Sequence, residues 1–162
     1  MRGASPLGDA CLLDFEATGT AAPLNYDMAR VTVWLFVQTE SISPDELSRI
    51  IGLPYDTCRR KGEPPTGRPG MASKTNSWRL EAVREVPEDP EEVCRQIRAA
   101  VWDVVNRVGG HEEGLAAARE QGHSGVMIGL LAESVPSIEF DAPLLKALAA
   151  LNLDLQLDLI VG

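Results

Sequence analysis

The chain has 162 residues, with 15 Lys and Arg against 24 Asp and Glu, which gives a net charge of -9 at neutral pH. This length fits one domain with an ordinary hydrophobic core. The negative charge argues against binding nucleic acid by bulk neutralisation of phosphates. Three widely spaced cysteines without a CxxC pair predict neither a disulfide framework nor a zinc site. We therefore expect a cytoplasmic protein, and no apolar stretch approaches the roughly 20 residues that cross a membrane.

The N-terminal part of the chain differs in composition from the rest. Residues 1–28 are rich in Gly, Ala, Ser and Pro without a sustained period, which predicts an extension outside the core. A single α+β domain is expected over residues 29–162. It begins with residues 30–38, which are β-branched and aromatic with apolar side chains on both faces. That pattern is typical of a central strand.

A short helix is expected next, because its start and its end both carry capping residues. Ser43 and Glu46 form a capping box around Pro44, a favoured residue at the first helical position. Gly52 fits the left-handed residue that ends a helix. We therefore predict a helix over residues 44–51.

The following stretch lacks any period, and the second strand comes after it. Residues 53–76 contain four prolines and three glycines, so we expect a long loop, and loops of this length are usually functional or disordered. Residues 77–83 then alternate, with Trp78 on the apolar side, which predicts a half-exposed strand. A stripe at helical spacing runs from Val93 to Val108 and predicts a long helix. A shorter helix is expected over residues 112–121.

The C-terminal part of the chain predicts two further strands and a helix. Residues 125–133 are almost continuously apolar, as in a central strand, and residues 137–140 are a candidate strand beside them. A final helix opens at Asp141, and its expected buried face consists of Leu144, Leu145, Leu148 and Leu151. Residues 153–161 alternate, which predicts a strand with one buried and one solvated side.

These elements together favour a particular fold class. Helices that return repeatedly over a sheet with half-exposed strands indicate a two-layer α+β sandwich, ferredoxin-like in broad plan. We expect a mostly antiparallel sheet of four to five strands with three to four helices. The order of the strands does not follow from the sequence.

Several of these stretches together resemble the bacterial domain-of-unknown-function family 4279. The similar features are the first strand, the stretch Ser43–Pro54 that contains the capped helix, the basic Arg59–Gly62 segment, Ser77–Leu80, and the closing helix and strand over residues 141–160. The resemblance covers about residues 30–160. It implies the fold and implies no activity.

The distribution of charge marks one candidate binding site. The segment from Arg59 to Arg84 holds seven basic and two acidic residues, whereas the rest of the chain holds 8 basic and 22 acidic residues. Arginine and lysine donors, a glycine that permits close backbone approach and an aromatic face suit a small anion. The candidate ligand-binding residues are Arg59, Arg60, Lys61, Gly62 and Trp78. The alternative is structural, with these cations paired to the acidic body of the protein.

The other tryptophans, histidines and cysteines do not form a pattern typical of a catalytic or metal-binding site. Trp34 and Trp102 lie in periodic elements and are expected to pack in the core. His111 and His123 lack a metal-binding spacing, so no metal and no cofactor are expected. Cys58 lies beside two arginines, yet no histidine accompanies it in a known catalytic arrangement. Glycine-rich phosphate loops and nucleophile motifs are missing too, so we lean towards a protein without catalytic activity.

The sequence leaves three classes of function open. The first is a non-catalytic protein-binding module, of an immunity or antitoxin kind, that uses its acidic body to contact a protein partner. The second is a binder of a small anionic or phosphorylated ligand through the basic loop 59–79. An enzyme is the third and least supported class. A homodimer is a further option, because a Leu-rich edge strand such as residues 153–161 needs a cover.

Overall fold

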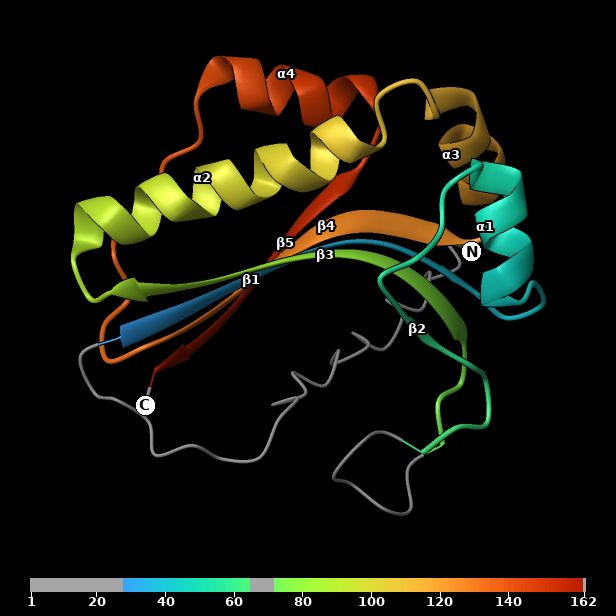
Figure 1. Ribbon diagram of the computed structural model, residues 1–162, viewed down its shortest axis with the longest axis horizontal. Helices are drawn as coiled ribbons and strands as arrows, with labels where there is room; N and C mark the ends of the chain where they lie inside the picture. The colour runs from blue at the N-terminus through green and yellow to red at the C-terminus, as the bar shows by residue number, and fades with distance from the viewer. Residues whose placement is uncertain (1–27, 65–71, 162) are drawn as a thin grey trace, which may run out of the picture.

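The computed structural model describes residues 28–64 and 72–161. Within them the chain forms, in order, β1 (Met28–Thr39), α1 (Pro44–Ile51), β2 (Thr57–Arg59), β3 (Asn76–Pro87), α2 (Pro90–Arg107), α3 (Glu112–Arg119), β4 (His123–Ala132), α4 (Ala142–Ala150) and β5 (Asp154–Val161). The described helices all lie on one side of the sheet (Figure 1). This arrangement confirms the expected α+β class and its two layers. The expected extension, residues 1–28, lies outside the described residues except for Met28.

The sheet is mixed, with the strands in the order β2-β3-β1-β4-β5. β1 pairs with β3 and with β4 in antiparallel fashion, as β2 does with β3, whereas β4 and β5 are parallel. The predicted central position of β1 is therefore correct. Parallel strands need a crossover connection, which α4 supplies between β4 and β5. The connection β3–α2–β4 leaves β1 between two parallel strands, which is the split β-α-β arrangement of the expected plan.

The hydrophobic core lies between the sheet and its helices. The register places Val33 beside Ala82 on one side and beside Ile128 on the other, so these three side chains share one face of the sheet. Val33 and Ile128 are completely buried, and Val101 and Val104 of α2 are equally inaccessible. The valines on one face of α2 thus face the alternate residues of β1, β3 and β4. Both faces follow from the sequence, the first from the helical spacing on α2 and the second from the alternation along the strands.

The caps of α1 form as its sequence predicts. Ser43 Oγ accepts a hydrogen bond from the backbone N–H of Glu46 at 3.2 Å. Gly52 ends the helix in the left-handed conformation, with φ of 82°, and its N–H donates to the carbonyl of Ser48. Because α1 is thus fixed at both ends, the residues around it are held in defined positions.

Two expectations about strands were wrong. The stretch over residues 53–76 contains the short strand β2, whose Cys58 pairs with Trp78 of β3. Residues 137–140 form no strand, because the neighbours of β4 in the sheet are β1 and β5. Three residues of β2 are too few to show alternation, and pairing with β3 rather than local pattern makes them a strand.

The closing helix and strand are less buried than their patterns predict. Leu144 and Leu148 are buried as expected, but Leu145 is 46% exposed. On β5 the expected buried side is largely open, since Leu157 and Val161 are 49% and 60% exposed. β5 is the last strand of the sheet, and α4 packs against α2. None of the helices in the described ranges has both the length and the apolar character needed to cross a membrane.

Candidate functional site: a basic turn and an acidic end

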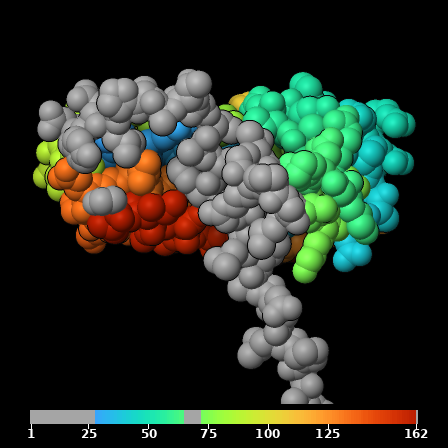
Figure 2. Space-filling view, turned by 90° about the horizontal axis from the view of Figure 1, so that it is seen from below, coloured from blue at the N-terminus to red at the C-terminus, as the bar shows by residue number. Residues whose placement is uncertain are grey.

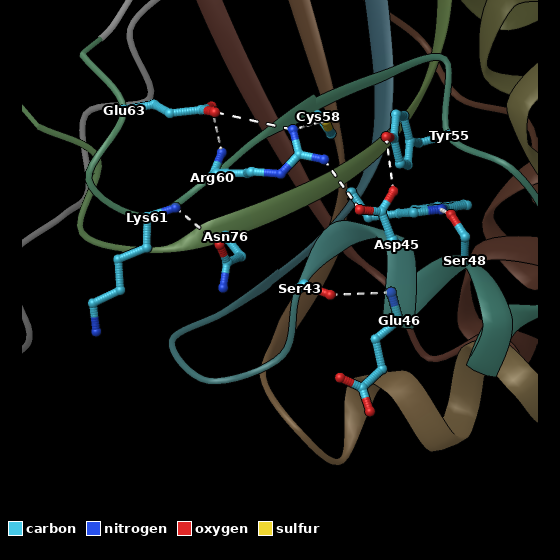
Figure 3. A network of polar contacts seen from close by, with 11 residues as sticks. Ser43, Asp45, Glu46, Ser48, Tyr55, Cys58, Arg60, Lys61, Glu63 and Asn76 are labelled. Carbon is cyan, nitrogen blue, oxygen red and sulfur yellow. Dashed lines mark hydrogen bonds and ion pairs between the residues drawn. The ribbon is translucent and has the colours of Figure 1, made fainter.

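The residues Arg59–Gly62, here called the basic turn, begin at the last residue of β2 and lie beside the start of β3. Arg59 pairs with Ser77 in the sheet, and the backbone N–H of Lys61 donates to Asn76 Oδ1 at 2.8 Å. Arg59 is half-buried, whereas Arg60, Lys61 and Gly62 are exposed. The structure therefore brings these four candidate residues together at one end of β3. Figure 3 shows Arg60 and Lys61 there, close to α1.

Arg60 is held between carboxylates from two different segments. Its Nη2 donates to Asp45 Oδ2 at 3.0 Å, and its Nη1 lies 4.0 Å from Glu63 Oε1. The backbone N–H of Arg60 also donates to Glu63 Oε2 at 2.8 Å. Asp45 comes from the first turn of α1, so this contact joins the basic turn to the helix (Figure 3). The donors of Arg60 that suit an external anion thus bind carboxylates of the protein itself.

The other donors of the turn have internal partners too. Lys61 Nζ lies 3.9 Å from Glu40 Oε2, a weak and exposed contact. Gly62 adopts a φ of 89°, and its backbone N–H donates to the carbonyl of Ser73 at 2.8 Å. The glycine therefore serves the shape of the turn, because its N–H does not point to an open site.

A tyrosine extends this polar network and perturbs its ionisation. Tyr55 OH donates to Asp45 Oδ1 at 3.0 Å. Hydrogen bonds from Tyr55 and then from Arg60 hold the pKa of Asp45 below its usual value. Hydrogen bonds to Cys58 and then to Asp45 hold the pKa of Tyr55 above its usual value. The carboxylate of Asp45 is thus stabilised in its charged form by neighbours on both sides.

Trp78 does not join the basic turn as a stacking face. Its side chain is completely buried, and its indole N–H donates to Ser48 Oγ at 3.1 Å and to the carbonyl of Leu53 at 3.3 Å. The ring therefore fills the space between β3 and α1 and offers no surface to a ligand. Trp34 and Trp102 are half-buried, as expected of packing residues, and Trp34 Nε1 donates to Glu81 Oε1 at 3.0 Å.

Two further cations of the basic segment lie on β3, with Arg79 next to the pair of Arg59 and Ser77 and Arg84 towards the other end of the strand. Arg79 Nε donates to Ser77 Oγ at 2.9 Å, and Arg84 forms an ion pair with Asp103 of α2. Arg68 lies outside the described residues. The structural alternative considered above therefore holds for Arg60, Lys61 and Arg84, while ligand binding by Arg59, Arg60, Lys61 and Gly62 stays a prediction.

The opposite end of the sheet carries a concentration of carboxylates that we call the acidic end. Two segments form it, residues 85–92 from the end of β3 to the first turn of α2, and residues 133–141 between β4 and α4. Neither segment contains a lysine or an arginine. Their acidic residues are Glu85, Glu88, Asp89, Glu91, Glu92, Glu133, Glu139 and Asp141. Most of these side chains are exposed.

One hydrogen bond joins the two acidic segments directly, and a second holds residues 133–141 beside the next turn of α2. The backbone N–H of Glu133 donates to Glu88 Oε1 at 2.7 Å. The thiol of Cys94 donates to the carbonyl of Ser137 at 2.9 Å. Part of the negative charge has a local reason, because Glu91 and Glu92 lie in the first turn of α2 and complement its dipole. Glu133 and Glu139 lie in the connection before α4, outside any helix, so this reason does not extend to them.

The basic turn and the acidic end lie at opposite ends of β3, which spans Asn76–Pro87. At about 3.4 Å per residue this strand separates them by about 35 to 40 Å. The sequence analysis marked the basic segment but singled out neither acidic segment, and it did not foresee that residues 133–141 join residues 85–92. The composition of these two segments, acidic without any cation, was the available signal.

One shallow cavity of about 430 Å³ opens between β3 and α2. It is lined by Glu81, Ala82, Arg84, Asp103, Asn106 and Arg107. Its charged groups of opposite sign pair with one another, as Arg84 does with Asp103. Across residues 28–64 and 72–161, no group of three or more His, Cys, Asp or Glu side chains is arranged to hold a metal ion.

Comparison with known proteins adds a family match and nothing closer. A family model described as a domain of unknown function (DUF4279) matches residues 29–162. This match confirms the resemblance drawn from the sequence motifs. No curated protein and no solved structure matches the chain.

Proposed function

We propose that this chain, which belongs to the DUF4279 family, is a non-catalytic protein-binding module whose acidic end contacts a basic surface of a partner protein. One observation carries the proposal. Two segments that are distant in sequence, residues 85–92 and 133–141, are joined into one exposed surface that holds carboxylates and neither lysine nor arginine. An immunity or antitoxin role, in which this surface masks a basic toxin or nuclease, is the form of the proposal that we favour.

The charge pattern supports this proposal through the physics of association. A surface of one sign attracts a partner of opposite sign, orients it and disfavours partners with the wrong charge. Within the described chain, Glu91 and Glu139 are exposed and form no ion pair. Their charges therefore remain available to arginines and lysines of another protein. By contrast, Arg60 and Lys61 of the basic turn already contact carboxylates.

Charge reversal at the acidic end tests the proposal. The tagged protein and a Glu91→Lys, Glu139→Lys variant are used to capture partners from the native host at low and at moderate salt. A matched control, Glu46→Lys with Glu120→Lys, makes the same change of charge on α1 and just after α3. A captured protein is then purified, and its affinity for each form is measured by calorimetry.

The expected result is a basic partner whose affinity falls at least tenfold in the Glu91→Lys, Glu139→Lys variant and is retained in the control. Its affinity for the unaltered protein should also fall as salt screens the opposite charges. An equal loss of affinity in both variants would show that only the net charge of the protein matters, and it would overturn the role of the acidic end. A partner that binds all three forms with equal affinity would also overturn the role of the acidic end.

The second candidate function, binding of a small anionic or phosphorylated ligand, has one observation in its favour. The basic turn already accommodates carboxylate oxygens, with Glu63 held both by the backbone N–H and near the guanidinium of Arg60. An external anion would have to displace Glu63 or Asp45. Titration with inorganic phosphate, followed by NMR, should then show binding to the unaltered protein and none to an Arg59→Ala, Arg60→Ala, Lys61→Ala variant.

A further inference from the structure

The two edges of the sheet are protected to very different degrees. The edge strand β2 has three residues, which leaves few unpaired backbone groups. The other edge strand, β5, has eight residues and contains no proline, lysine or arginine. Natural edge strands are usually short, charged with lysine, interrupted by proline or bulged, because an open edge pairs readily with another chain. Of the two edges, β5 is therefore the less protected one, with Asp154 and Asp158 as its only charged residues.

The side chains of β5 point to the same conclusion as its backbone. Leu157, Leu159 and Val161 are 49%, 39% and 60% exposed. They alternate along the strand and so lie on a single face. In the space-filling view from below, β5 (red) lies at the surface of the molecule (Figure 2). Among residues 28–64 and 72–161 no strand pairs with the outer edge of β5, and an apolar stripe beside such an edge fits another β-strand that carries apolar residues at the same spacing.

We propose that the occupant of this edge is a second copy of the same strand, so that β5 of two chains pair in antiparallel fashion about a two-fold axis centred on Leu157. Antiparallel pairing of identical strands gives the closed, isologous contact typical of homodimers. In this register Leu155 lies opposite Leu159 of the second copy, and Leu157 opposite itself. Gln156 then lies opposite Asp158, where its amide N–H₂ group donates to the carboxylate.

The charges of β5 select this register among its alternatives. A shift by one residue turns every side chain to the other face, so only centres that keep apolar residues opposite apolar residues are compatible. Centring the pair on Asp158 would place that carboxylate opposite itself, and centring it on Gln156 would place Asp154 opposite Asp158. Like charges directly opposite each other destabilise a strand pair. The register centred on Leu157 avoids both and pairs the strand over nearly its full length.

The mass of the protein in solution is the first test. Sedimentation velocity of the full chain over a dilution series should show a species of twice 17.5 kDa that dissociates on dilution. The Leu157→Lys variant should sediment as a monomer, because it places two cations opposite each other at the centre of the pair. The matched control is Leu145→Lys, which alters a leucine of α4 with similar exposure and should remain dimeric.

A cross-linking test examines the register itself. In a background where Cys11, Cys58 and Cys94 are replaced by serine, a Leu157→Cys variant should form an intermolecular disulfide with oxidised glutathione as the oxidant. Its two Cα atoms would lie about 4.5 to 5.5 Å apart, which a disulfide spans. A Leu159→Cys variant should not cross-link to itself, because four residues along the strand correspond to about 13 Å.

The outcomes distinguish this dimer from a monomer, from a dimer through another surface and from another register, and they are independent of the proposed function. A monomer at every concentration overturns it, and so does a dimer that Leu145→Lys dissociates while Leu157→Lys does not. Cross-linking through residue 159 and not through residue 157 overturns the register. Because each chain carries a charge of -9, dimerisation through this apolar edge should strengthen as salt is added, whereas capture of a basic partner should weaken.

Discussion

Asp56 and Arg107 form a two-point ion pair that joins the residue before β2 to the last turn of α2. Arg107 Nη1 donates to Asp56 Oδ2 at 2.6 Å, and Nη2 donates to Oδ1 at 2.7 Å. Asp56 Oδ2 also accepts the backbone N–H of Glu81 at 2.7 Å. The carboxylate thus connects three segments, and the hydrogen bonds from Arg107 in particular hold its pKa below the usual value.

An Asp56→Asn variant should lose this ion pair while its side-chain oxygen still accepts the N–H of Glu81. We expect the free energy of unfolding at pH 7 to fall by about 1 to 2 kcal/mol, since the pair is hydrogen-bonded but partly exposed. Urea unfolding measures this difference. A Glu139→Gln control, at an exposed carboxylate without an ion pair in the described structure, should change it by less than about 0.5 kcal/mol.

The effect of Asp56 on stability should depend on pH in one direction. The pKa of Asp56 is lowered in the folded state, so its contribution is fully present above the unfolded pKa of about 3.9. As the pH falls below that value and through the folded pKa, the contribution is lost. The difference between Asp56→Asn and the unaltered protein should therefore shrink below about pH 4. A difference that stays constant down to pH 2 would contradict it.

Removing the hydroxyl of Tyr55 should change the ionisation of Asp45. The hydrogen bond from Tyr55 is the largest cause of the lowered pKa of Asp45. In a Tyr55→Phe variant we expect this pKa to rise towards its usual value, as measured by carbon-13 NMR of the carboxyl group over a pH series. The Asp45 resonance of a Ser134→Ala variant, which removes an exposed hydroxyl at the acidic end, serves as the control and should titrate as in the unaltered protein.

A glycine on α3 should resist replacement by alanine even though it lies in a helix. Alanine is favoured over glycine there by about 1 kcal/mol. However, a Cβ at Gly114 would lie 2.5 Å from the carbonyl oxygen of Ile50 and 2.6 Å from that of Ile51. Because backbone of α1 has to move, Gly114→Ala should cost about 1 to 3 kcal/mol of unfolding free energy. Ala117→Gly, at an exposed site of α3, should cost about 1 kcal/mol from helix propensity alone.

The burial of Trp78 predicts a structural role that can be separated from ligand binding. A Trp78→Phe variant leaves Ser48 and the carbonyl of Leu53 without their shared indole donor, which should cost about 1 to 3 kcal/mol. Thermal unfolding should show this loss, and Trp102→Phe, at a half-buried site, should show less. If the basic turn binds phosphate, its affinity should be the same in Trp78→Phe as in the unaltered protein.

Local patterns in the sequence predicted most elements, because caps and periodicity act over a few residues. Ser43 and Gly52 marked both ends of α1, and the apolar character of β1 on both faces indicated its central place. The alternation of β3 also held a signal for Trp78, since it has the same parity as Leu80 and Ala82, which are buried. The interpretation of Trp78 as a ligand-stacking residue did not take this burial signal into account.

Features that depend on tertiary contacts could not be predicted in this way. β2 is a strand only because β3 lies beside it, and Asp45 reaches Arg60 only because α1 stands next to the basic turn. The exposure of β5 follows from the strand order, which no local pattern encodes. The same holds for the acidic end, whose two segments meet through Glu88 and Glu133.

The central position of the first described strand has a consequence for folding during synthesis. Val33 of β1 needs Ala82 on one side and Ile128 on the other before its backbone is fully paired. At the usual pace of translation the ribosome takes on the order of ten seconds to advance between β1 and β4. During that time an apolar strand waits outside the ribosome without its second neighbour. We expect chaperones that bind extended apolar segments to engage residues 28–39 of the nascent chain and to release them once β4 has emerged.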